Sequence, residues 1–163
     1  MRFFVVILCL TTALFLNACE QETPANPNAP ATYNGNWVTF SYPNSWEIKE
    51  EKSESSTWIR IQGPGNASFS IEIRSLEQAP SLEAYASEQS QQQTLNPVAR
   101  PATSGRLHGF IHIMGIEGES HQREYHRIDS HDEAAFLVSE VPTAEAIHAQ
   151  SGLDRIFTTF AFQ

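Results

Sequence analysis

The chain has 163 residues, of which 40% are hydrophobic, and a formal net charge of −9 at pH 7. This length suits one domain with its own core. The excess of acidic residues disfavours a nucleic-acid partner, because phosphate groups bind basic surfaces.

The N-terminus begins with Arg2 and continues into a mostly apolar run, Phe3–Leu16. A helix of that length would rise about 21 Å, which is short of a hydrocarbon core of about 30 Å. A basic start, a short apolar core and a small residue before the break are typical of a secretory signal. We therefore expect residues 1–18 to be a signal peptide.

The signal ends in "LNAC", Leu16–Cys19. This stretch resembles the lipobox of bacterial lipoproteins, in which the cysteine receives diacylglycerol and the new N-terminus is usually acylated. The resemblance implies lipidation of Cys19, with palmitate as a typical chain, and attachment to the membrane of the cell envelope. Glu20, rather than Asp, favours the outer membrane facing the periplasm over the inner membrane. The alternative is an ordinary signal cleaved near Ala18.

Lipidation would also account for both cysteines of the chain. Cys9 would leave with the signal and Cys19 would become a thioether, so the mature protein could form no disulfide and would depend on its core. Removal of Arg2 leaves nine basic against nineteen acidic residues, for a net charge of −10. More than one acyl chain would make the anchor effectively permanent.

Residues 19–35 hold three prolines and few large apolar side chains. Such a segment cannot bury enough surface to offset its ordering entropy, so we expect a lipidated, disordered tether. Residues 36–163 should then form a single domain, which we expect to be a monomer.

Alternating apolar and polar residues predict strands in 36–42 and from Trp46, joined by a turn at Pro43-Asn44. Residues 58–61 and 69–73 predict a hairpin around "GPGN". Ser81 is a plausible cap for a helix to about Thr94.

Residues 96–105 contain two prolines and predict a loop, followed by a strand over 106–118. Residues 121–142 predict a long hairpin with its tip at 130–133. A C-terminal helix should begin near Thr143 and kink or restart at Gly152. Its apolar stripe has the spacing i, i+3, i+4 and i+7 and consists of Leu153, Ile156, Phe157 and Phe160.

This order of elements predicts an α+β fold, an antiparallel sheet of about six or seven strands flanked by two main helices. "FSYPNSWEI", the "SLEAYA" helix, the long hairpin and the terminal "IFTTFAF" together resemble the PsbP-like fold. That group includes the extrinsic PsbP proteins of photosystem II, a Ran-binding nuclear-import factor and bacterial lipoproteins of the DcrB type. The resemblance implies an accessory or binding role and supplies no shared catalytic residues.

The six histidines lie between His108 and His148. A zinc or copper site could form across neighbouring strands from His112, His121 and His126. No compact metal-binding spacing is present, so we expect exposed sheet histidines and no metal. An acid–base pair is conceivable at the hairpin tip, where His126 and His131 lie near Asp129 and Asp132, but a solvated turn explains that tip better.

Three tryptophans, Trp37, Trp46 and Trp58, occur in the first predicted strands. They suit a core, and the alternative is an aromatic surface for a ligand or partner. Arg123 and Arg127 share one strand face with Tyr125. They could grip an acidic or phosphate-bearing partner, but in an acidic chain we expect them to pair with carboxylates on adjacent strands.

We therefore expect a lipid-anchored envelope protein without a cofactor, whose role is non-catalytic: it would bind or support an envelope protein complex. The alternative is a binder of metal or a small ligand that uses the histidine-rich hairpins. An enzyme is the least favoured class.

Overall fold

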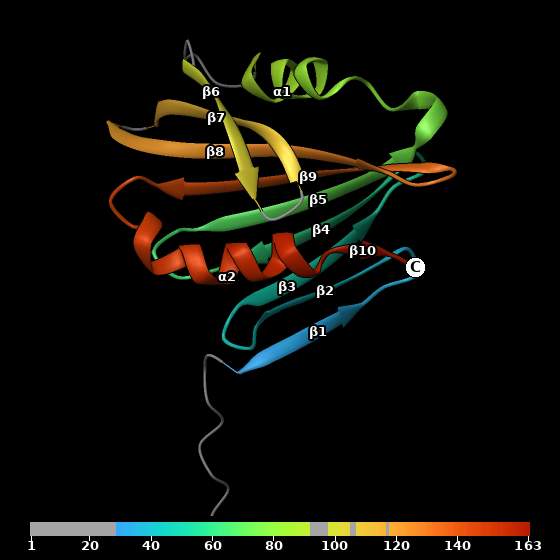
Figure 1. Ribbon diagram of the computed structural model, residues 1–163, viewed down its shortest axis with the longest axis horizontal. Helices are drawn as coiled ribbons and strands as arrows, with labels where there is room; N and C mark the ends of the chain where they lie inside the picture. Colours follow the sequence, from blue (N-terminus) through green and yellow to red (C-terminus); the bar gives the residue numbers. More distant parts are fainter. Residues whose placement is uncertain (1–28, 92–97, 105–106, 117) are drawn as a thin grey trace, which may run out of the picture.

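The computed structural model describes residues 29–91, 98–104, 107–116 and 118–163 (Figure 1). In chain order its strands and helices are β1 (Pro30–Asn34), β2 (Val38–Pro43), β3 (Glu47–Lys52), β4 (Ser56–Gln62), β5 (Ser68–Ser75), the short 3-10 helix η1 (Leu76–Gln78), α1 (Leu82–Gln91), β6 (Val98–Ser104), β7 (Leu107–Ile116), β8 (Glu119–Asp129), β9 (Glu133–Pro142), α2 (Ala146–Thr159) and β10 (Ala161–Phe162).

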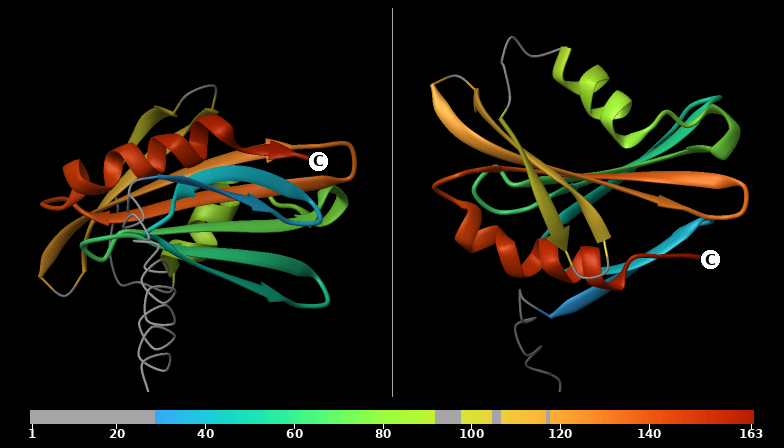
Figure 2. Two further views of the ribbon diagram at one scale, coloured as in Figure 1. Left: turned by 90° about the horizontal axis from the view of Figure 1, so that it is seen from below. Right: turned by 45° about the horizontal axis from the view of Figure 1, so that its top comes forward.

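The strands form two antiparallel sheets, a large one of seven strands in the order β3-β4-β5-β9-β8-β7-β6 and a small one in the order β1-β2-β10. Helix α1 lies on one face of the large sheet, and α2 lies on the other face with the small sheet (Figure 2). The predicted α+β class, with an antiparallel sheet and two main helices, is confirmed.

The main core fills the space between the large sheet, α2 and the small sheet. Alternate residues of β4 and β5 point into it, as the hairpin pattern predicted: Ile59, Ile61, Phe69, Ile71 and Ile73 are all buried. The apolar stripe of α2 meets them, and the ring of Phe157 packs edge-on against Phe69 with centroids 5.1 Å apart. The predicted orientation of this helix is therefore confirmed.

A smaller core lies beneath α1. Tyr85 stacks on Phe136 of β9 with ring centroids 4.1 Å apart, and Tyr125 of β8 is fully buried beside them. The predicted cap is present, because the Ala84 backbone N–H donates to Ser81 Oγ at 3.2 Å. The expected end of this helix near Thr94 lies outside the described residues.

The folded domain begins earlier than the sequence predicted. β1 falls within the segment expected to be a disordered tether, yet it pairs along its whole length with β2. Its composition hides this strand, since a single large side chain, Tyr33, stacks on Phe40 with centroids 5.0 Å apart. β1 is held in place by its backbone pairing with β2, and the amino-acid composition of a segment does not reveal such pairing.

The predicted loop over residues 96–105 is also wrong where the structure describes it. Residues 98–104 form β6, an edge strand that pairs only with β7, so that Pro101 lies opposite Phe110. Proline lacks a backbone donor and is tolerated on the outer strand of a sheet, where one side of the backbone needs no partner.

Helix α2 differs from the prediction at its start and in its middle. Its N-cap is Glu145, without a side-chain cap bond, whereas Thr143 Oγ1 lies 3.0 Å from Ser120 Oγ. The helix passes through Gly152 without interruption and ends at Thr159, after which β10 begins. Glycine is needed at 152 because a Cβ there would overlap the indole of Trp46.

Candidate functional site

A hollow lined by described residues lies on the face of the large sheet that carries α1. It is a cleft of about 360 Å³, and we call it the α1-face cleft. Its walls come from β4, β5, β9 and β8 and from the side of α1 that carries Tyr85 and Gln89. Four strands and a helix thus converge on one surface.

Strand register explains why the sheet is hollow there. Arg60 on β4 lies opposite Ser70 on β5, and Ser70 lies opposite Val138 on β9. In a neighbouring row, Ser68 lies between Gln62 and Glu140. The serines are short and stand between larger residues on both neighbouring strands, so they leave a depression along β5.

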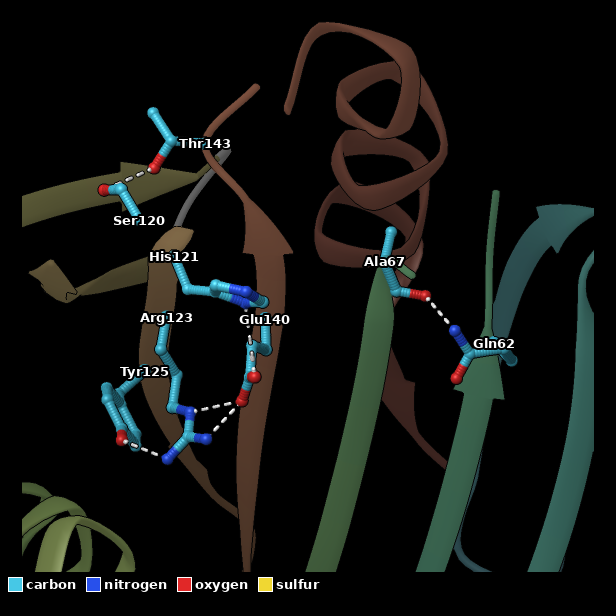
Figure 3. Close-up of polar contacts among 8 residues, drawn as sticks. All are labelled: Gln62, Ala67, Ser120, His121, Arg123, Tyr125, Glu140 and Thr143. Atoms are coloured by element: carbon cyan, nitrogen blue, oxygen red, sulfur yellow. Dashed lines mark hydrogen bonds and ion pairs between the residues drawn. The ribbon is translucent and has the colours of Figure 1, made fainter. Parts of the chain in front are cut away.

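A fixed polar group forms one end of the cleft (Figure 3). Arg123 on β8 faces Glu140 on β9, and its Nε donates to Glu140 Oε2 at 2.8 Å while Nη2 makes a second contact with the same oxygen. Its Nη1 lies 3.4 Å from the hydroxyl of Tyr125. Burial opposes the charge of Arg123, but these bonds outweigh it and hold its pKa above the usual value.

Within the described residues, each arginine on this face has a carboxylate nearby. Arg123 pairs with Glu140, and the remaining nitrogen–oxygen pairs are Arg74 with Glu72 at 2.7 Å, Arg127 with Asp129 at 2.7 Å and Arg60 with Glu51 at 3.7 Å. The expected pairing of Arg123 across adjacent strands is confirmed, whereas the partner of Arg127 lies on its own strand. The buried charge of Arg123 is therefore closely paired, whereas Arg60 and Glu51 form a loose pair at the exposed edge of the cleft.

Other polar groups of the cleft have no protein partner among the described residues. The hydroxyls of Ser68 and Ser70 and the amide of Gln89 are half-buried, and each can both donate and accept hydrogen bonds. Trp58 forms an aromatic wall, with the guanidinium of Arg60 5.4 Å from its ring centroid. These are the side chains that a ligand in the cleft would meet.

The three histidines considered as metal ligands do not come together on one face. His112 and His121 project on the α1 side, since their strand partners are Arg123 and Met114, whereas His126 is buried on the α2 side against Phe157, with ring centroids 4.8 Å apart. Among the described residues, no three His, Cys, Asp or Glu side chains are placed to hold one metal ion.

The individual surroundings of these histidines also differ. His126 Nε2 lies 2.6 Å from Glu124 Oε1 inside the main core. His121 Nδ1 lies 3.5 Å from Glu140 Oε1. Burial lowers the pKa of His112, and the neighbouring charge of Arg123 lowers it further.

The hairpin tip has the geometry of a solvated turn. The side chains of His131 and Asp132 are 97% and 84% exposed, and their closest nitrogen and oxygen lie 3.7 Å apart. Ser130 closes the turn, because its Oγ accepts from the Glu133 backbone N–H at 3.1 Å. The serine hydroxyl is thus occupied by the backbone rather than by a general base.

The tryptophans have three different environments. Trp46 is buried, Trp37 is 46% exposed at the turn between β1 and β2, and only Trp58 borders the cleft. Sequence reasoning identified Arg123 and Trp58 but not Ser68, Ser70 or Gln89. The polar parity of "SFSIEI" could have shown the serines to share one face, but it could not show that they lie in a cleft.

The chain is similar to several solved structures of low sequence identity. Cyanobacterial PsbP (CyanoP) from Synechocystis sp. PCC 6803 has a TM-score of 0.53 at 11% identity, over 86% of this chain and 96% of that one. A protein from Bacteroides thetaiotaomicron VPI-5482 has a TM-score of 0.51 at 15% identity over 85% of this chain, and this chain covers 49% of it, about half its length. LpqN, involved in cell envelope biogenesis of Mycobacterium tuberculosis, has a TM-score of 0.49 at 13% identity, over 86% and 87% of the two chains.

The sequence itself matches no protein-family profile and no curated protein. The structural likeness to CyanoP shows the fold, which is PsbP-like and α+β, as the sequence resemblance implied. Within the part of the chain that the structure describes, no helix is long and apolar enough to cross a membrane.

Proposed function

We propose that this chain is a lipid-anchored protein of the cell envelope with a non-catalytic role, binding or supporting an envelope protein complex. The lipobox resemblance at Cys19 supports the anchor, and Glu20 favours the outer membrane on its periplasmic side. Since β1 begins at Pro30, only the ten residues 20–29 separate Cys19 from the first strand, which limits the distance between them to about 40 Å. The domain would thus work close to the membrane surface.

The α1-face cleft is the observation that favours a non-catalytic role. Catalysis by acid–base or nucleophilic groups needs a free base beside the reacting atom. In the cleft, Glu140 is instead committed to Arg123, and the serines have no histidine partner within the described residues. This arrangement suits recognition of a ligand rather than its transformation.

The anchor is tested with two cysteine variants of the full chain. Cys19→Ser should abolish labelling with radioactive palmitate and release the protein from membranes. Cys9→Ser is the matched control and should leave labelling and fractionation unchanged, because Cys9 lies within the predicted signal. Membrane retention of the Cys19→Ser protein after a carbonate wash would contradict the lipid anchor.

The protein partner is tested by photo-crosslinking in living cells. A photoreactive residue would replace Trp37 or Ile147, the two large apolar side chains that are exposed in the described domain, at 46% and 81%. Glu54, exposed in the turn between β3 and β4, serves as the control position. We expect one discrete protein adduct from Trp37 or Ile147 and none from Glu54. Equal smears from all three positions would contradict a specific complex.

A second candidate function is the binding of a small ligand. The cleft volume of about 360 Å³ lies within the range of about 300–1,000 Å³ common for small-molecule sites. The cleft, rather than the histidine-rich hairpins, is the proposed site, since His126 lies on the other face of the sheet from His112 and His121. Elemental analysis of the purified, untagged protein tests the metal version of this candidate, for which we expect no stoichiometric zinc or copper.

A further inference from the structure

We propose that the α1-face cleft binds an uncharged saccharide, with one pyranose ring of a glycan held beside Trp58. The inference rests on the second candidate function above, because it names the ligand class of that same cleft. It depends on neither the lipid anchor nor the protein complex.

Charge is the first property that selects the ligand. The buried Arg123 is compensated by Glu140, whereas Arg60 forms only a loose pair with Glu51 at 3.7 Å, in which both side chains are largely exposed. A phosphate or carboxylate ligand would meet the carboxylate of Glu140 and would have to compete for Arg123, which is only 7% exposed. A cation would meet both guanidinium groups. The cleft therefore favours a ligand without net charge.

Polarity is the second property. A wholly apolar ligand, such as a lipid chain, would cover the hydroxyls of Ser68 and Ser70 and the amide of Gln89 without giving them hydrogen bonds. Leaving buried polar groups unpaired in this way is costly. Hydroxyl groups of a sugar satisfy them, because each hydroxyl donates one hydrogen bond and accepts others, as serine and glutamine side chains also do.

Shape is the third property. The fixed, planar guanidinium–carboxylate pair of Arg123 and Glu140 stands at one side of the cleft, and the aromatic Trp58 stands on β4 across the serine row. A pyranose has polar hydroxyls around its rim and apolar C–H groups on its ring faces. The rim suits the planar polar groups, and a ring face suits the indole of Trp58, one face of which carries the Arg60 guanidinium 5.4 Å from the ring centroid.

The test is calorimetric titration of the full chain, purified in a detergent without a sugar headgroup. The probes are maltotriose and the trimer of N-acetylglucosamine, with inorganic phosphate and a neutral glycine–serine peptide as the arms for an anion and a peptide ligand. We expect at least one saccharide to bind in the millimolar range or tighter, and phosphate and peptide not to bind. Absence of binding by both saccharides, or binding of phosphate or peptide instead, would overturn the proposal.

Variants locate the binding. Trp58→Ala should weaken saccharide binding at least about tenfold, and Ser70→Ala should weaken it about three- to tenfold, through loss of one hydrogen bond. Trp37→Ala is the matched control, because Trp37 lies at the turn between β1 and β2, and it should bind as wild type does. Unchanged affinity in Ser70→Ala and Trp58→Ala proteins that still unfold cooperatively would overturn the site. Because the proposed protein complex is tested by crosslinking at other positions, either proposal can fail while the other stands.

Discussion

Replacement of Phe157 by alanine tests the packing of α2 on the large sheet. The ring is 3% exposed, and it makes edge-on contacts with Phe69 and His126 at centroid distances of 5.1 and 4.8 Å. Phe157→Ala removes both contacts and leaves a cavity between α2 and the sheet. Buried phenylalanine-to-alanine changes cost about 3–5 kcal/mol. Because α2 is also held by β2 and cannot easily close the gap, we expect a loss in the upper half of that range.

The assay is urea unfolding of the full chain, followed by tryptophan fluorescence. Ile147→Ala provides a control on the same helix, since its side chain is 81% exposed and the change should alter stability by no more than about 0.5 kcal/mol. A loss below about 1 kcal/mol for Phe157→Ala, with the same dependence on urea concentration as wild type, would refute the proposed packing of α2.

Two further predictions concern a glycine and a histidine. Gly152→Ala should destabilise the protein by about 1–3 kcal/mol, because the new Cβ would overlap the indole of Trp46. This loss should exceed the gain of about 1 kcal/mol in helix propensity that alanine brings. Increased stability in urea unfolding would show that the indole can move aside. The lowered pKa of His112 means that the folded state binds fewer protons than the unfolded chain, in which the pKa is about 6.5. This contribution to stability is therefore present at neutral pH and is lost as pH falls from about 6.5 through the lower folded pKa. His112→Gln should flatten the dependence of unfolding free energy on pH between about 7 and 5, whereas an unchanged slope would assign that dependence to other groups.

A strand that alternates between an apolar, buried face and a polar face was predictable from the sequence. The hairpin β4–β5 alternates apolar and polar residues around a recognisable turn, so the orientation of Ile59, Ile61 and Phe69 followed from parity alone. The hairpin β8–β9 does not alternate in this way, because β9 is buried on both faces. The strands β1 and β6 were not predicted from the sequence, because neither segment has a clear alternating pattern of its own. Each of these strands is held in place by pairing with a neighbouring strand. Pro101 indicates a loop unless β6 is known to be an edge strand, where proline is tolerated.

The cleft was less predictable than the core, because it depends on which strands are neighbours. The alternation along β8 placed Arg123 and Tyr125 on one face of the sheet. The cleft also needs β5 to lie between β4 and β9, and in that arrangement Phe69 pairs with Ser139, seventy positions away in the chain. No local pattern shows such a pairing. The depression over Ser68 and Ser70 therefore became visible only with the full register.

The two faces of the large sheet differ in a way that bears on how binding could evolve on this fold. The α2 face is closed by a helix and a second sheet and holds the larger apolar cluster, so most of the hydrophobic stabilisation lies there. The α1 face needs to bury only the small cluster around Tyr85 and Phe136. Its remaining surface can carry serines, a glutamine and paired charges at little cost to the core. Ser70→Ala should accordingly leave the unfolding free energy within about 0.5 kcal/mol of wild type. A loss comparable to that expected for Phe157→Ala would show that the serine row is part of the structural framework, and that the two faces are not separable.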